Sequence, residues 1–125
     1  MNHLFTAQEF NDTAKAVAQV LHFIHITSVR MTPRERFFLS LGLRVSHAQE
    51  AARRGDPKRA LVHKAHVQHH LKNMPRPITE RDKQLFHLGI LSTRLEEALA
   101  YGETVRAKKI GLQLMQFIKS LAPKK

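Results

Sequence analysis

An internal repeat with a period of 47 residues limits the folds that this chain can adopt. Residues 32–76 align without a gap onto residues 79–123, and ten of the aligned residues are identical. The identical pairs include Leu41-Gly42 with Leu88-Gly89, Glu50-Ala51 with Glu97-Ala98, Gly55 with Gly102, and Arg59-Ala60 with Arg106-Ala107. A repeat of this length is typical of a structural unit that the chain builds twice.

Each copy has the pattern of two helices separated by a glycine. Thr32 with Glu35, and Thr79 with Asp82, have the spacing of a capping box, which marks the start of a helix. Apolar residues then recur every three or four positions, as in a helix with one buried face. The sequence predicts helices over about residues 33–54, 57–73 and 80–101, and a further helix from Gly102 to a frayed basic tail at residues 122–125.

The first 31 residues resemble a partial third copy. Thr6 and Glu9 form another capping box, and the apolar residues that follow predict a helix to about Thr27. No segment alternates between apolar and polar residues, so no strand is expected. We therefore predict a single all-α domain over residues 1–125, with about five helices in repeated antiparallel hairpins. The hairpins would form either a short helical repeat or an up-down bundle.

Two further expectations follow from this pattern. Gly42 and Gly89 lie inside predicted helices, where glycine costs about 1 kcal/mol relative to alanine. The favoured interpretation is that they allow another helix to approach closely; the alternative is a kink or a ligand contact. An unpaired fifth helix would also leave an open end, at which a homodimer could form.

Composition excludes several classes of function. The chain has no cysteine, which excludes disulfides, thiolate metal sites and cysteine nucleophiles. Its longest apolar run is far shorter than the roughly 20 residues of a membrane span, and its first residues do not resemble a signal peptide. We therefore expect a cytoplasmic protein without integral membrane insertion.

The formal net charge of +11 is concentrated in two segments. Residues 53–76 and residues 104–125 each carry +6, whereas residues 77–103 carry −2. These segments hold equivalent helices of the repeat, and in a stack of hairpins equivalent helices lie on the same side. The sequence thus predicts one continuous basic surface formed by Arg53, Arg54, Lys58, Arg59, Lys64, Lys72, Arg76, Arg106, Lys108, Lys109 and Lys119.

A continuous basic surface favours an anionic partner. The leading hypothesis is a nucleic acid, DNA or RNA, bound mainly through its phosphates in a regulatory or accessory role. The alternative is a protein-interaction adaptor that binds an acidic partner surface, since helical repeats commonly bind proteins. A solvated face that only maintains solubility is the simplest interpretation.

Four histidines lie in the predicted helix over residues 57–73: His63, His66, His69 and His70. Because His63 aligns with Ile110 and His70 with Phe117, the favoured interpretation places imidazoles at a half-buried helix interface. A contact with the partner and a metal site are the alternatives. If these histidines contact an anionic partner, protonation near pH 6.5 would strengthen binding in acid.

The sequence offers no catalytic constellation. No glycine-rich phosphate loop, His-Glu-x-x-His motif or paired acid and base is present. We therefore expect a protein that is not an enzyme, with no catalytic residue, no cofactor and no metal.

Overall fold

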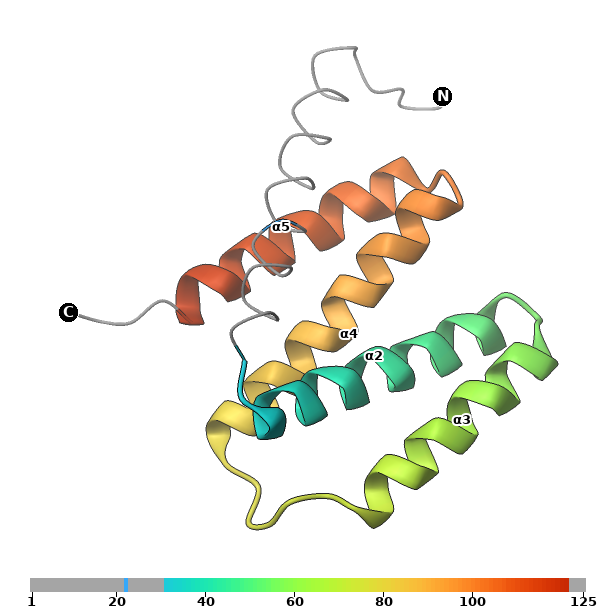
Figure 1. The fold of residues 1–125 in the computed structure, drawn as a ribbon. Helices are drawn as coiled ribbons and strands as arrows, with labels where there is room; N and C mark the ends of the chain where they lie inside the picture. Colours follow the sequence, from blue (N-terminus) through green and yellow to red (C-terminus); the bar gives the residue numbers. More distant parts are fainter. Residues whose placement is uncertain (1–21, 23–30, 122–125) are drawn as a thin grey trace, which may run out of the picture.

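A computed structural model describes His22 and residues 31–121, and residues 31–121 form four packed helices (Figure 1). These are α2 (Pro33–Arg53), α3 (Pro57–Lys72), α4 (Glu80–Ala100) and α5 (Thr104–Leu121). No strand occurs in this part of the chain, so the prediction of an all-helical fold is confirmed. The predicted helix over residues 6–27 and the tail at residues 122–125 lie outside the described residues.

The predicted caps set the helix boundaries. The Thr32 hydroxyl accepts a hydrogen bond from the Glu35 amide at 3.2 Å, and the Glu35 carboxylate accepts one from the Thr32 amide at 3.0 Å. Thr79 and Asp82 form the same reciprocal pair at the start of α4. Each box satisfies backbone amides that a helix start otherwise leaves free, which explains why both helices begin there.

The chain turns sharply after α2 and after α4. Gly55 and Gly102 have φ values of 73° and 67°, a left-handed conformation that favours glycine. The Asp56 side chain then accepts a hydrogen bond from the Arg59 amide and caps α3. The loop between α3 and α4 contains Pro75 and Pro77, and a proline cannot continue a helix.

The helices pack in the spatial order α3, α2, α4, α5. The main contacts join α2 with α4, α2 with α3, and α4 with α5. Figure 1 accordingly shows α3 and α5 on opposite sides of the α2–α4 pair. The prediction that α3 and α5 share one continuous basic surface is therefore wrong, because the equivalent helices are not stacked side by side.

The core lies along α4 and is unequal on its two sides. Leu85, Leu88 and Leu95 of α4 and Leu114 of α5 are at most 1% exposed. By contrast, no residue of α3 is fully buried. Burial of apolar surface drives helix packing, so α3 is the least firmly held of the four helices.

Helices α2 and α4 cross where the two copies of the Leu-Gly pair meet. A Cβ atom placed on Gly42 would overlap the carbonyl group of Phe86 and lie 3.2 Å from the Gly89 Cα. One placed on Gly89 would likewise overlap the Leu39 carbonyl oxygen and lie 2.9 Å from the Leu43 nitrogen. The interpretation that these glycines permit close helix approach is confirmed, and each glycine lies against the other.

Ion pairs between the two copies are reciprocal. Arg34 pairs with Asp82 at 2.7 Å, and its equivalent Arg81 pairs with Glu35, the equivalent of Asp82, at 3.3 Å. Both pairs bridge α2 and α4 at their N-terminal ends. Thus the arginine of each copy pairs with the carboxylate of the other copy.

The four helices lack the features of a membrane span. Among the described residues, no helix is both long enough and apolar enough to cross a bilayer.

Candidate nucleic-acid interface

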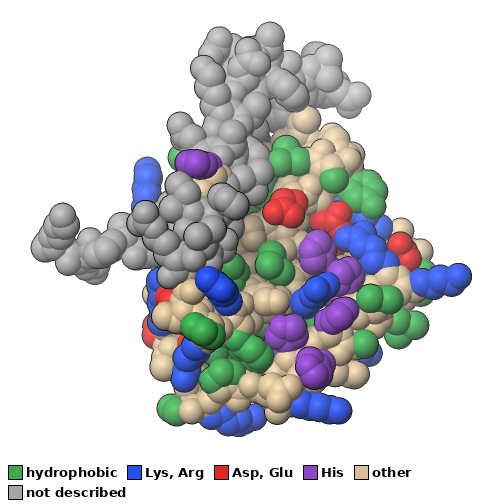
Figure 2. Space-filling view, in the orientation of Figure 1, with side chains coloured by type: hydrophobic (Ala, Val, Ile, Leu, Met, Phe, Trp, Pro, Cys, Tyr) green, Lys and Arg blue, Asp and Glu red, His purple; other side chains and the backbone are tan. Residues whose placement is uncertain are grey.

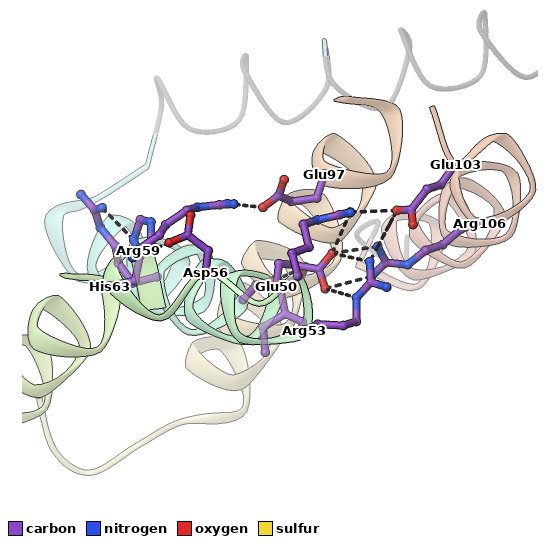
Figure 3. Close-up of polar contacts among 12 residues, drawn as sticks. Glu50, Arg53, Asp56, Arg59, His63, Glu97, Glu103 and Arg106 are labelled. Atoms are coloured by element: carbon purple, nitrogen blue, oxygen red, sulfur yellow. Dashed lines mark hydrogen bonds and ion pairs between the residues drawn. The ribbon is translucent and has the colours of Figure 1, made fainter. Parts of the chain in front are cut away.

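Glu50 is the centre of an ion-pair network that joins α2 to α5 (Figure 3). Its carboxylate is 4% exposed and accepts two hydrogen bonds from the Arg106 guanidinium, at 2.7 and 3.0 Å. Arg53 donates two more, at 3.3 and 3.4 Å. Burial raises the pKa of Glu50, but the hydrogen bonds from Arg106 and Arg53 outweigh this effect and lower the pKa to about 2.

Two further arginines of the predicted surface, Arg54 and Arg59, also pair with carboxylates inside the chain. Arg59 pairs with Glu97, the equivalent of Glu50, and thereby ties α3 to α4 (Figure 3). Arg54 pairs with Glu103 at 2.8 Å, and its guanidinium lies 3.5 Å from the centre of the Tyr101 ring. The structure thus places Arg53, Arg54, Arg59 and Arg106 in internal ion pairs that neutralise much of their charge.

The lysines of α3 are placed differently. Lys58, Lys64 and Lys72 are exposed along α3, and Arg76 is exposed in the loop that follows. None of these four forms an ion pair with a described residue, and α3 itself contains no acidic side chain. The structure therefore leaves α3 and its loop as a concentrated source of positive charge, which we call the α3 cationic strip.

On α5, the predicted cations divide into two groups. Lys109 and Lys119 are exposed, whereas Lys108 is half-buried and interacts within the chain. Since α5 lies across the α2–α4 pair from α3, the α5 lysines form a separate surface from the α3 cationic strip. Of the eleven predicted cations, Lys58, Lys64, Lys72 and Arg76 are the ones that α3 and its following loop expose without an ion pair to a described residue.

Histidine side chains gather over the α2–α3 pair (Figure 2). The ring of His63 stacks on that of His47 of α2, with ring centres 4.8 Å apart. His70 lies 5.2 Å from the Phe37 ring, and its Nδ1 donates to the His66 carbonyl oxygen at 2.8 Å. His63 and His70 therefore lie at the half-buried interface expected from their alignment with Ile110 and Phe117.

The environment of the stacked pair disfavours protonation. Burial lowers the pKa of His63, and the neighbouring His47 and Arg44 lower it further. Burial and the charge of Arg59 likewise lower the pKa of His47, more than Glu97 raises it. At any given pH near 6.5, His63 is therefore less protonated than an ordinary histidine.

Acid is expected to destabilise the α2–α3 contact through this pair. Because the folded-state pKa values of His47 and His63 lie below the ordinary value of 6.5, their contribution to stability is full above pH 6.5 and is lost as pH falls below it. The urea midpoint should fall between pH 7.5 and 5.5. His63→Ile, which introduces the residue of the second copy, should reduce this dependence, whereas His69→Gln should not. An unchanged dependence in the first variant would contradict the assignment.

The sequence reasoning missed two features of this region. It did not pair Glu50 with Arg106 or Glu97 with Arg59. The glutamate and the arginine are each identical between the two copies, and this identity could have indicated a shared structural role. It also missed an apolar cavity between α2, α3 and the start of α4. The cavity depends on how α3 packs against α2, which the sequence pattern does not determine. No group of three metal-ligating side chains occurs within the described residues.

Comparison with known proteins gives no relative for this chain. No protein-family model, curated protein or solved structure matches it.

Proposed function

We propose that the protein is not an enzyme and that it binds nucleic acid through phosphate contacts made by the α3 cationic strip. The observation that carries this proposal is the contrast between the cations that pair within the chain and those that do not. Arg53, Arg54, Arg59 and Arg106 pair with carboxylates of the chain, whereas Lys58, Lys64, Lys72 and Arg76 have no acidic partner among the described residues. These four cations are free to meet an external anion.

The dimensions of α3 suit a phosphate backbone. With a rise of 1.5 Å per residue, the 14 positions from Lys58 to Lys72 span about 21 Å. Duplex DNA carries one negative charge per about 1.7 Å of its axis, so a helix of this length can lie beside several phosphates. Such contacts carry little sequence information, so duplex DNA and structured RNA of unrelated sequences should compete.

The salt dependence of binding tests this proposal. The double variant Lys58→Gln/Lys72→Gln should bind random duplex DNA more weakly and lower the slope of log K against log salt by about 2, since two phosphate contacts are lost. The matched variant Lys109→Gln/Lys119→Gln removes the same charge from α5 and should leave the slope nearly unchanged. Fluorescence anisotropy across 50–200 mM salt measures both.

Two results would overturn the proposal. Absence of binding to DNA and to RNA at 50 mM salt would remove nucleic acid as the partner. An equal loss of affinity in the two double variants would show that binding follows net charge rather than the α3 cationic strip.

An acidic protein surface is the alternative partner, and one observation favours it. Leu61 and Val62 of α3 are 66% and 56% exposed and lie close to Lys58 along the helix. Apolar contacts flanked by cations suit a protein interface with an acidic rim. If nucleic acid fails to bind, Leu61→Ser/Val62→Ser should abolish capture of acidic proteins, a loss that an unspecific charge effect would not produce.

We also propose that the 47-residue repeat is structural, with two helical hairpins related by an approximate two-fold axis. The contact between Gly42 and Gly89 and the reciprocal ion pairs support this, because a two-fold axis makes residue i contact j while j contacts i. On this proposal α3 and α5 are equivalent in origin, and α3 has acquired the binding surface.

A further inference from the structure

An apolar cavity of about 360 Å³ opens between α2, α3 and the start of α4. Its walls include Phe38 and Leu41 of α2 and Val67 and Leu71 of α3, and the α3–α4 loop contributes Ile78. Leu71 and Ile78 are 49% and 46% exposed, so the cavity is open to solvent at this end. Its volume lies within the usual range for small-molecule sites, which are mostly apolar.

The equivalent residues in the other half of the molecule are more deeply buried. Phe38, Leu41 and Val67 correspond to Leu85, Leu88 and Leu114, all of which are at most 1% exposed. Helix α3 places the smaller Val67 where α5 has Leu114, and no residue of α3 is fully buried. Residue 67 of α3 is therefore less well packed than its equivalent in α5.

The charges at the rim favour a negative group. Two charged residues line the cavity, Asp82 and Lys83. Hydrogen bonds from Arg34, at 2.7 and 3.2 Å, hold the Asp82 carboxylate, which is therefore already neutralised. Lys83 is exposed and forms no ion pair with a described residue. The uncompensated charge at the mouth is thus positive.

We propose that this cavity binds a single-chain amphiphile, with its apolar body between α2 and α3 and one anionic head group beside Lys83. The apolar walls contact the body of the ligand, and the ammonium group of Lys83 selects a carboxylate or a similar head group over a neutral or positive one. The ligand would also bury Leu71 and Ile78, which the protein alone leaves exposed.

Calorimetric titration of the full chain with decanoate, below its micellar concentration, tests the proposal. The protein should bind decanoate in a one-to-one ratio. Val67→Phe, which fills the cavity, should retain its helical circular dichroism and lose at least tenfold in affinity. Lys83→Gln should weaken decanoate binding about threefold, as expected for an exposed ion pair, and leave the binding of decanol unchanged.

A matched variant separates the cavity from general adsorption to a basic protein. Lys109→Gln removes one exposed charge from α5 and should leave decanoate affinity unchanged. An equal loss in Lys83→Gln and Lys109→Gln would overturn the proposal, as would unchanged binding in Val67→Phe or the absence of binding at millimolar decanoate. Because none of these variants belongs to the α3 cationic strip, DNA binding should persist in all of them.

Discussion

Replacement of Gly42 by alanine is expected to lower the free energy of unfolding by about 3 kcal/mol, the upper part of the range for overpacked cores. The added methyl group would overlap the Phe86 carbonyl, a backbone group that moves only if α4 moves. Separation of α2 from α4 would in turn weaken contacts along the whole crossing. Chemical denaturation followed by circular dichroism measures the loss.

A control and a double variant make this expectation specific. At Gly55 a Cβ atom would meet no atom within 4 Å, so Gly55→Ala should cost only the roughly 1–2 kcal/mol of a left-handed alanine. Gly89→Ala should resemble Gly42→Ala, and the double variant should lose less than the sum, because both substitutions open the same contact. Additive losses, or a smaller loss at Gly42 than at Gly55, would show that the helices do not cross at these glycines.

Replacement of Glu50 by glutamine is expected to lower the free energy of unfolding by about 3 kcal/mol, since the partners of a buried carboxylate are left uncompensated. Arg106 would lose the acceptor that joins α5 to α2, and both Arg106 and Arg53 would retain only Glu103. Glu97→Gln is the matched variant at the equivalent position. It removes one arginine ion pair rather than three, so its effect should be smaller.

The loss of stability at acid pH should depend on the same ion-pair network. The pKa of Glu50 is about 2 in the folded protein, below its ordinary value of 4.5. Its contribution is therefore complete above pH 4.5 and is lost as pH falls from 4.5 towards 2. In Glu50→Gln the free energy of unfolding should decline less steeply over this pH interval than it does in the wild type. A decline of unchanged steepness would mean that Glu50 does not carry this part of the stability.

Local features of the fold could be predicted from the sequence because their causes are local. Thr32 and Thr79 cap helices through partners three residues away, and Gly55 marks the end of α2 through its own backbone conformation. Such contacts depend on spacing along the chain alone. The glycine in the Leu-Gly pair could also be assigned a packing role, although the repeat did not show that its partner would be the other glycine.

The arrangement of the helices could not be predicted in the same way. A repeat states that two segments are alike, but either a translation or a two-fold rotation can relate them. A translation would place α3 beside α5, whereas the structure places them on opposite sides of the α2–α4 pair. The predicted basic surface therefore separates into two.

The sequence predicted too many residues for the candidate site for a related reason. Summing charge along the chain treats Arg59 and Arg106 as free, whereas their partners Glu97 and Glu50 are 38 and 56 residues away. Only the packed structure brings these groups together. The lysines of α3 remained in the site because the helix that carries them has no acidic side chain of its own.

Protection of individual lysines from acetylation, measured on the full chain with and without duplex DNA at low salt, tests the central claim most directly. Modification of Lys58, Lys64 and Lys72 should fall when DNA is bound, while Lys109 and Lys119 on α5 remain as reactive as in the free protein. Protection of the α5 lysines alone, equal protection of both groups, or no protection of α3 would contradict the assignment of nucleic-acid binding to the α3 cationic strip.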